Sequence, residues 1–196
     1  LSTGRAGVPR GVRAGIGAGG RYGALHWQNP AAWFTNVPGL KVVAPSTPAD
    51  AKAPLKAAIR DDNPVVFFHH YLATLEHGEV PEGEHLVPFG EAAVRREGSD
   101  VTIVALGYMV GKALAAAETL AGEGISVELI DPRTVAPLDV ETIGRSVRKT
   151  GRLLIVDEAF APFGVGAEIA AQVADRGFDD LDAPVERVCG AEVPLP

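Results

Sequence analysis

The sequence has few of the residues that form crosslinks, metal sites or membrane spans. It contains a single cysteine, Cys189, which excludes an internal disulfide and a cysteine-based zinc site. That usage fits a cytosolic compartment, the cytoplasm of a bacterium or the mitochondrial matrix of a eukaryote. No apolar run approaches the roughly 18 residues of a membrane helix, and no charged-then-apolar leader opens the chain. A formal net charge of −7 favours neither a nucleic-acid partner nor a membrane partner.

Glycine, in contrast, is concentrated near the N-terminal end. Five glycines lie between Gly15 and Gly23, within a Gly- and Arg-rich stretch that covers residues 1–23. Such a density of glycine indicates unusual backbone angles, or a backbone that closely approaches another group. The composition favours a mobile surface loop. No Gly-Lys-Ser/Thr follows, so the stretch is not a phosphate loop. The chain starts at Leu1 instead of Met, and we expect its true beginning to be missing.

The second half of the chain alternates short β-branched runs with helix-period segments. The runs cover residues 100–107, 125–131 and 152–157, and the helical segments cover Met109–Gly122 and 140–149. This alternation predicts a parallel sheet wound by right-handed crossovers and covered by helices on both faces. A glycine-broken turn at 161–166 leads into a further helix, and residues 183–189 read as a last strand. Gly164-Val-Gly166 lacks the third glycine of a dinucleotide fingerprint and favours a tight turn.

A second strand–helix–strand unit occupies residues 40–68. Thr47 is a suitable N-cap for its helix, with Pro48 at the first helical position. We expect Pro54 to kink or shorten this helix, and we expect a buried stripe of Ala51, Leu55, Ala58 and Ile59. Residues 76–90 have no periodicity and predict a linker between two domains.

The histidines are the candidate chemical residues. His26 stands beside Trp27, and a lone histidine in that setting is more often packed than catalytic. His69 and His70 end a strand and point to opposite faces, so they cannot share one metal ion. A zinc site that recruits His77 and His85 is an alternative.

Several motifs together resemble one family. They are Pro-Gly-Leu-Lys-Val-Val-Ala-Pro at 38–45, residues 50–52 and 57–66, Asp-Val-Thr-Ile-Val at 100–104, Asp-Pro-Arg-Thr-Val-Ala-Pro-Leu-Asp at 131–139, and residues 146–152, 166–169 and 183–188. This set resembles the beta subunit of the thiamine-diphosphate-dependent component of 2-oxo acid dehydrogenase complexes. The resemblance implies an α/β fold: part of a pyrimidine-binding domain at 1–75, a linker at 76–93, and a transketolase C-terminal-like domain at 94–196. That last domain should be a three-layer α/β/α unit with a mainly parallel sheet.

The resemblance also implies an activity and its partners. The expected reaction is oxidative decarboxylation of a 2-oxo acid, pyruvate or a branched-chain acid, with acyl transfer to a lipoyl group. Thiamine diphosphate and magnesium would be held jointly with an alpha subunit, and a second beta subunit and a lipoyl-bearing acyltransferase core would be further partners. The family's pyrimidine-binding glutamate lies upstream of this sequence, so we expect this chain alone to be inactive. The alternatives are an acetoin-type or other transketolase-like enzyme subunit, and a non-catalytic module that docks subunits.

Site residues follow from the same resemblance. His26 falls at the family's His-Ser-Gln motif and is the expected catalytic residue for acyl transfer, although Trp27 replaces the serine. The turn after the helix resembles a potassium site, and the alternative is a capped helix end without an ion. Its expected ligands are Ala58, Ile59, Asp61 and Asn63, with the backbone carbonyl of Arg10. His69 stands where the family usually carries glutamate.

Overall fold

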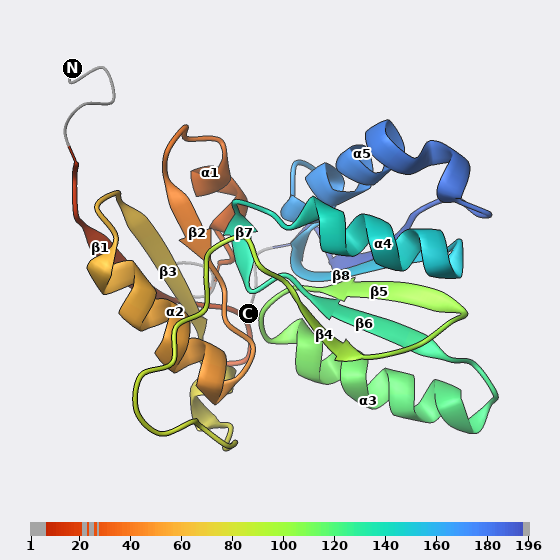
Figure 1. The fold of residues 1–196 in the computed structure, drawn as a ribbon, viewed down its shortest axis with the longest axis horizontal. Helices are drawn as coiled ribbons and strands as arrows, with labels where there is room; N and C mark the ends of the chain where they lie inside the picture. The colour runs from red at the N-terminus through yellow and green to blue at the C-terminus, as the bar shows by residue number, and fades with distance from the viewer. Residues whose placement is uncertain (1–6, 21–22, 24–25, 27, 194–196) are drawn as a thin grey trace.

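The computed structural model describes residues 7–20, 23, 26 and 28–193. They fold into two β-sheets that lie side by side, each with its own helices (Figure 1). None of the helices in these described ranges is long and apolar enough to cross a membrane. The predicted α/β class is confirmed, because both sheets are mainly parallel and alternate with helices along the chain.

The first sheet is built around one buried, mainly apolar strand, Val65–His70. Its strands are β1 (Gly11–Ile16), β2 (Lys41–Val43), β3 (Val65–His70) and β7 (Thr134–Ala136), in the order β1-β3-β2-β7. Helices α1 (Ala31–Thr35) and α2 (Pro48–Arg60) precede β2 and β3, and the 3-10 turn η1 (Leu72–Leu75) follows β3. β3 runs parallel to β1 and β2, whereas β7 is antiparallel to β2. The second half of the chain therefore contributes a strand to the first sheet.

The second sheet has helices on both faces. Its strands are β4 (Ala93–Arg96), β5 (Val101–Ala105), β6 (Val127–Asp131), β8 (Leu153–Phe160) and β9 (Glu186–Gly190), in the order β4-β6-β5-β8-β9. The helices are α3 (Met109–Gly122), α4 (Val140–Thr150) and α5 (Val165–Gly177), followed by the 3-10 turn η2 (Phe178–Asp180). Figure 1 shows α3 on one side of the sheet and α4 and α5 on the other. Ile103 packs with α3, and its neighbour Val104 with α4 and α5, so the expected three-layer arrangement is confirmed.

Local capping rules set several of the helix ends. The Thr47 hydroxyl accepts a hydrogen bond from the Asp50 amide at 3.1 Å at the start of α2, and Asp139 accepts one from the Thr142 amide at 3.0 Å at the start of α4. Gly151 ends α4 with a φ of 69°, a left-handed angle that glycine adopts without strain. Side-chain caps of this kind stabilise a helix by about 1 kcal/mol each.

The glycine-rich stretch is not a loop throughout. Gly11–Ile16 forms the edge strand β1, paired in parallel with β3 from Gly11↔Val65 to Ile16↔His70. The prediction of a surface loop is therefore wrong for this part. Residues 11–13 of this edge strand are exposed, and only Ile16 at its end is buried in the core. The strand therefore shows no alternation of apolar and polar side chains that would mark it in the sequence.

Helix α2 differs from its predicted face. Ala53, Pro54 and Ala58 are buried, whereas Ile59 is 72% exposed. The helix has this orientation because the side chain of Asp50 is also buried on its inner face, where it forms an ion pair with Arg95 of β4. The expected shortening at Pro54 is wrong, since α2 continues through it to Arg60. The buried proline ring packs inside, and the helix loses one backbone hydrogen bond.

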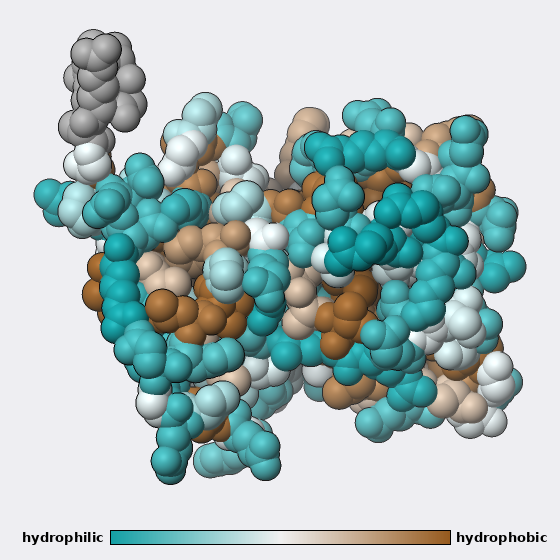
Figure 2. Space-filling view, in the orientation of Figure 1, coloured by the Kyte–Doolittle hydropathy of each residue, from teal (hydrophilic) through white to brown (hydrophobic). Residues whose placement is uncertain are grey.

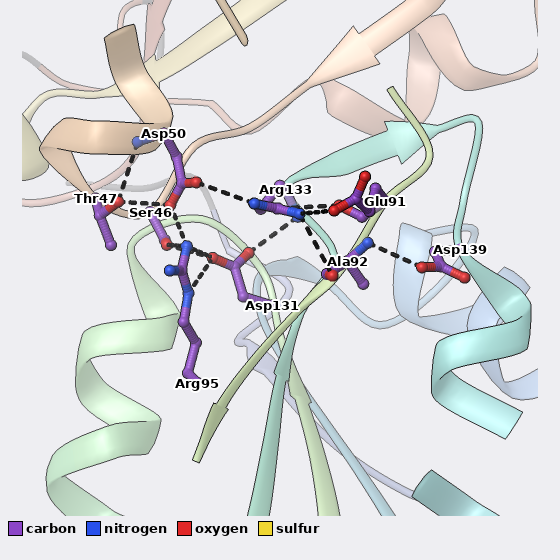
Figure 3. A network of polar contacts seen from close by, with 9 residues as sticks. All are labelled: Ser46, Thr47, Asp50, Glu91, Ala92, Arg95, Asp131, Arg133 and Asp139. Atoms are coloured by element: carbon purple, nitrogen blue, oxygen red, sulfur yellow. Dashed lines mark hydrogen bonds and ion pairs between the residues drawn. The ribbon is translucent and has the colours of Figure 1, made fainter. Parts of the chain in front are cut away.

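Polar contacts join the two sheets (Figure 3). Asp131, at the end of β6, is fully buried, and Arg95 donates to its Oδ2 from Nη2 at 2.7 Å and from Nε at 3.0 Å. The same guanidinium binds Asp50 at the start of α2, and the Ser46 hydroxyl donates to Asp131. Burial raises the pKa of Asp131, although the positive charge of Arg95 opposes the rise. This network fixes the N-terminus of α2 against the second sheet.

Candidate functional site

The carboxyl ends of parallel strands from both sheets meet at one crevice, which we call the seam. Ligand sites of open α/β sheets lie at such ends. Its lining includes Ile16, Phe68, His70, Tyr108, Asp157 and Glu158. The cavity volume is about 20 Å³, room for about one water molecule. A cofactor of the size of thiamine diphosphate does not fit in the seam as these residues form it.

A histidine–glutamate pair closes the seam. His70 Nε2 lies 3.0 and 3.1 Å from the two carboxylate oxygens of Glu158, and their side chains are 4% and 14% exposed. His70 Nδ1 accepts the backbone N–H of Leu72 at 3.1 Å. That acceptor role assigns the ring proton to Nε2, which donates it to Glu158. The imidazole also stacks on the Tyr108 ring at 4.4 Å between centroids and 10° between planes.

A second carboxyl group lies beside this pair. Asp157 is 4% exposed, and its Oδ1 accepts the backbone N–H of Ala159 at 3.0 Å. Burial raises the pKa of Asp157, and the neighbouring charge of Glu158 adds to the rise, while the Ala159 amide opposes it. The seam therefore holds the Glu158 carboxylate, which accepts hydrogen bonds from His70 and Ala18, next to Asp157, a buried carboxyl group whose pKa is raised.

The predicted catalytic residue lies outside the seam. His26 is exposed, and its backbone N–H donates to the Gly23 carbonyl at 3.2 Å. Nearby, the Gly17 amide donates to the Gln28 carbonyl at 3.5 Å, so the segment that carries His26 is closed at its base. Trp27, which replaces the family's serine, lies outside the described residues. An exposed imidazole is accessible to a group delivered by another protein.

In the turn predicted to bind potassium, the carboxylate of Asp61 already has an ion-pair partner and a hydrogen-bond donor. Asp61 follows the last residue of α2, and one carboxylate oxygen binds Lys41 while the other accepts the Asn63 amide at 2.8 Å. Burial raises the pKa of Asp61, but the Lys41 and Asn63 hydrogen bonds outweigh it, so the net pKa is lowered. Ala58 is buried and Ile59 exposed, and the Arg10 carbonyl accepts the Val65 amide at 2.9 Å. An ion here would depend on the free carbonyls of the helix end.

The zinc alternative finds no support in the described part of the chain. Within it, no group of three or more His, Cys, Asp or Glu side chains is arranged to hold a metal ion. His70 is occupied by Glu158 instead. His69, on the opposite face of β3, has a buried Nδ1 without a hydrogen-bond partner, and burial lowers the pKa of its imidazole.

Sequence reasoning missed Tyr108, Asp157 and Glu158 as site residues. Their position in the sequence could have indicated a site. Asp157 and Glu158 come directly after the apolar residues of β8, and Tyr108 follows the end of β5. Polar residues at the carboxyl ends of parallel strands converge at the ligand-binding edge of a sheet. His70 ends β3 in the same way.

Comparisons with known proteins agree with this architecture. Residues 1–74 match the family described as transketolase, pyrimidine binding domain, and residues 90–196 match transketolase, C-terminal domain. A solved structure named "Split gene transketolase, inactive beta4 tetramer" superposes with a TM-score of 0.79 at 29% sequence identity, covering 98% of this chain and 62% of that one.

Curated relatives align over almost the whole chain. It is 50% identical over 193 residues to the acetoin:2,6-dichlorophenolindophenol oxidoreductase subunit beta of Cupriavidus necator, covering 98% of this chain and 57% of that protein. It is 52% identical over 179 residues to the mitochondrial pyruvate dehydrogenase E1 component subunit beta of Dictyostelium discoideum, covering 89% and 50%. The chain thus spans about half the length of the curated relatives that it matches. It belongs to the transketolase family, with a pyrimidine-binding domain followed by a C-terminal domain.

Proposed function

We propose that this chain is part of the beta subunit of a 2-oxo acid dehydrogenase, which decarboxylates a 2-oxo acid oxidatively and transfers the acyl group to a lipoyl group. The observation that carries the proposal is about 50% identity to the beta subunits of two pyruvate dehydrogenase E1 components, over 89% and 100% of this chain. In this proposal an alpha subunit, a second beta subunit and a lipoyl-bearing acyltransferase core are the partners. The compartment is the cytoplasm of a bacterium or the mitochondrial matrix.

Thiamine diphosphate is the cofactor implied by the pyrimidine-binding family, and in this proposal magnesium binds with it. The seam alone does not hold it, because it has room for about one water molecule. Binding would require residues from upstream sequence and from the alpha subunit. Exposed apolar side chains fit such partner contacts: Trp33 is 74% exposed, Ile59 72% and Phe163 97%. Figure 2 shows apolar patches open to the surface in its left half, where the first sheet and α2 lie.

His26 is the residue that we assign to acyl transfer. An imidazole can donate or accept a proton near neutral pH, and at the lipoyl group it would transfer a proton to or from the reacting sulfur. Its exposure fits a substrate that is carried by another protein. In the complete subunit assembled with an alpha subunit, His26→Ala is expected to lower lipoyl acylation by at least about 10²-fold. Decarboxylation, followed with an artificial electron acceptor, should be largely retained.

The control for this test is His85→Ala, because His85 is also exposed but lies in the linker. It should leave both half-reactions unchanged. Undiminished acylation in His26→Ala would remove His26 from the mechanism. An assembled complex without either half-reaction, even with His26 intact, would favour the non-catalytic docking module.

The second candidate is an acetoin-type enzyme, favoured by the 50% identity to the Cupriavidus necator protein. A substrate panel separates the two candidates. Pyruvate, a branched-chain 2-oxo acid and acetoin are offered in turn to the assembled complex, and product formation is compared. Selective turnover of acetoin would replace the 2-oxo acid assignment.

We further propose that a potassium ion binds the turn after α2. Ala58, Ile59, Asp61 and Asn63 would supply oxygens, with the Arg10 carbonyl as a further ligand, since a carbonyl that accepts one hydrogen bond retains a second lone pair. A bound ion must stabilise the folded state, by about 2.7 kcal/mol at a hundredfold excess over its Kd. We expect a higher unfolding temperature in potassium chloride than in choline chloride at equal ionic strength. Equal melting curves would mean a capped helix end without an ion.

A further inference from the structure

The segment that carries His26 starts directly at the His70–Glu158 pair. The backbone N–H of Ala18 donates to Glu158 Oε1 at 3.0 Å, and the adjacent Gly17 N–H closes the base of the segment on the Gln28 carbonyl at 3.5 Å. Glu158 belongs to β8 of the second sheet, whereas Ala18 follows β1 of the first. One carboxylate of the C-terminal domain thus holds the backbone on which the His26 segment begins.

The imidazole of His70 also contacts the backbone at the start of the His26 segment. A Cβ added to Gly17 would lie 1.9 Å from two atoms of the His70 ring, and one added to Gly19 would lie 2.7 Å from Leu72 Cδ1. The backbone of the segment therefore rests in contact with both side chains. Leu72 in turn donates its N–H to His70 Nδ1, so these residues form one continuous support under residues 17–19.

The support is rigid because each ring atom that can bond is engaged. His70 donates to Glu158 and accepts from Leu72, and one face stacks on Tyr108 at the N-terminus of α3. Both polar side chains are largely withdrawn from water, at 4% and 14% exposure. Hydrogen bonds to a carboxylate in such surroundings are shorter and stronger than neutral ones. A side chain fixed in this way transmits the position of the second sheet to the segment above it.

We propose that His70 and Glu158 are positioning residues: they set the base of the His26 segment against the C-terminal domain, and so set where His26 meets the lipoyl group. The placement of the segment does not depend on what His26 does. The consequence for the lipoyl group rests on the proposed role of His26. Neither residue touches the reacting atoms in this proposal. They act through the backbone at Gly17 and Ala18.

The test compares two replacements of Glu158 in the complete subunit assembled with its alpha partner. Glu158→Ala removes the acceptor of both N–H groups. Glu158→Gln keeps an oxygen at the Oε1 position, which lies 3.0 Å from the Ala18 nitrogen and 3.1 Å from His70 Nε2. We expect Glu158→Ala to lower lipoyl acylation at least tenfold while decarboxylation with an artificial acceptor stays within twofold, and Glu158→Gln to restore most of the loss. If Glu158→Ala does not assemble, His70→Asn is used, with the same expectation.

The control is Glu91→Ala, which removes an exposed carboxylate that pairs with Arg133 at 3.5 Å near the same domain boundary. It should change neither half-reaction. A second readout is hydrogen exchange at the Ala18 amide, which should quicken at least tenfold in Glu158→Ala and not in Glu91→Ala.

The outcomes separate the two proposals. Parallel loss of both half-reactions, or an unchanged exchange rate at Ala18, would make the pair a purely structural contact and overturn the inference. Faster exchange at Ala18 with acylation unaffected in both Glu158→Ala and His26→Ala would leave the support in place and refute the role of His26. Loss of acylation in His26→Ala together with normal acylation in Glu158→Ala would retain the role of His26 and refute positioning.

Discussion

Replacement of Arg95 by methionine is expected to lower the free energy of unfolding by about 3–5 kcal/mol, the usual effect of removing one partner from a buried ion pair. Arg95 is 24% exposed and contacts Asp131, which has no exposure, and Asp50, which is 5% exposed. Methionine retains much of the apolar stem but leaves both carboxylates without their main cation. Urea unfolding of the wild-type and variant proteins measures the difference. Arg148→Met is the matched control, since that side chain is 51% exposed and lies 3.9 Å from Asp180, and it should cost at most about 1 kcal/mol.

The pH dependence identifies the carboxylate responsible. Burial raises the pKa of Asp131 above its ordinary 3.8 even with Arg95 present, and Arg95 is the largest influence that lowers it. Without Arg95 the folded-state pKa rises further. A raised carboxyl pKa favours folding below the unfolded-state pKa, and this contribution is lost as pH rises through the folded-state pKa. The loss in Arg95→Met should therefore be larger at pH 7 than at pH 5. Adding Asp131→Asn should recover part of it, and a loss that is independent of pH and of Asp131→Asn would contradict this explanation.

Local signals in the sequence predicted most of the second sheet's elements. The helix expected over Met109–Gly122 has those bounds in the structure. In the first sheet's unit, Thr47 caps α2 as expected. Such features depend on a few neighbouring residues, so single-sequence reasoning can find them. Val165, Ile169 and Val173 of α5 are buried as their spacing requires.

Features that depend on distant pairing were not predictable in the same way. β1 is held by backbone bonds to a strand more than fifty positions away, and the prediction for Ile59 is wrong because Asp50 pairs with Arg95 across 45 positions. His70 and Glu158 are 88 positions apart. No periodicity encodes such a contact, although the position of both residues at the ends of parallel strands is a hint. The role of His26 came from resemblance alone and stays a prediction.

Gly17→Ala is expected to lower the free energy of unfolding, because the added methyl group collides with the His70 ring that closes the seam. The position requires a φ of +98°, and the added Cβ would lie 1.9 Å from His70 Cδ2 and Nε2. A non-glycine residue at positive φ costs about 1–3 kcal/mol, and overpacking a filled site costs about 1–3 kcal/mol more. The ring cannot swing aside cheaply, because it is hydrogen-bonded on both nitrogens and stacked on Tyr108.

Gly39 serves as a control that separates the cost of the positive φ from the cost of the clash with His70. Gly39 has a φ of +84° with nothing within 4 Å of an added Cβ, so Gly39→Ala carries the backbone cost alone. The excess loss in Gly17→Ala, expected at about 1–3 kcal/mol by urea unfolding, measures the resistance of the His70 ring. Combining Gly17→Ala with His70→Ala should remove that excess, since contacting residues are energetically coupled. Equal losses for the two glycine variants would show that the ring yields freely, and a ring that yields cannot hold the backbone of the His26 segment in place.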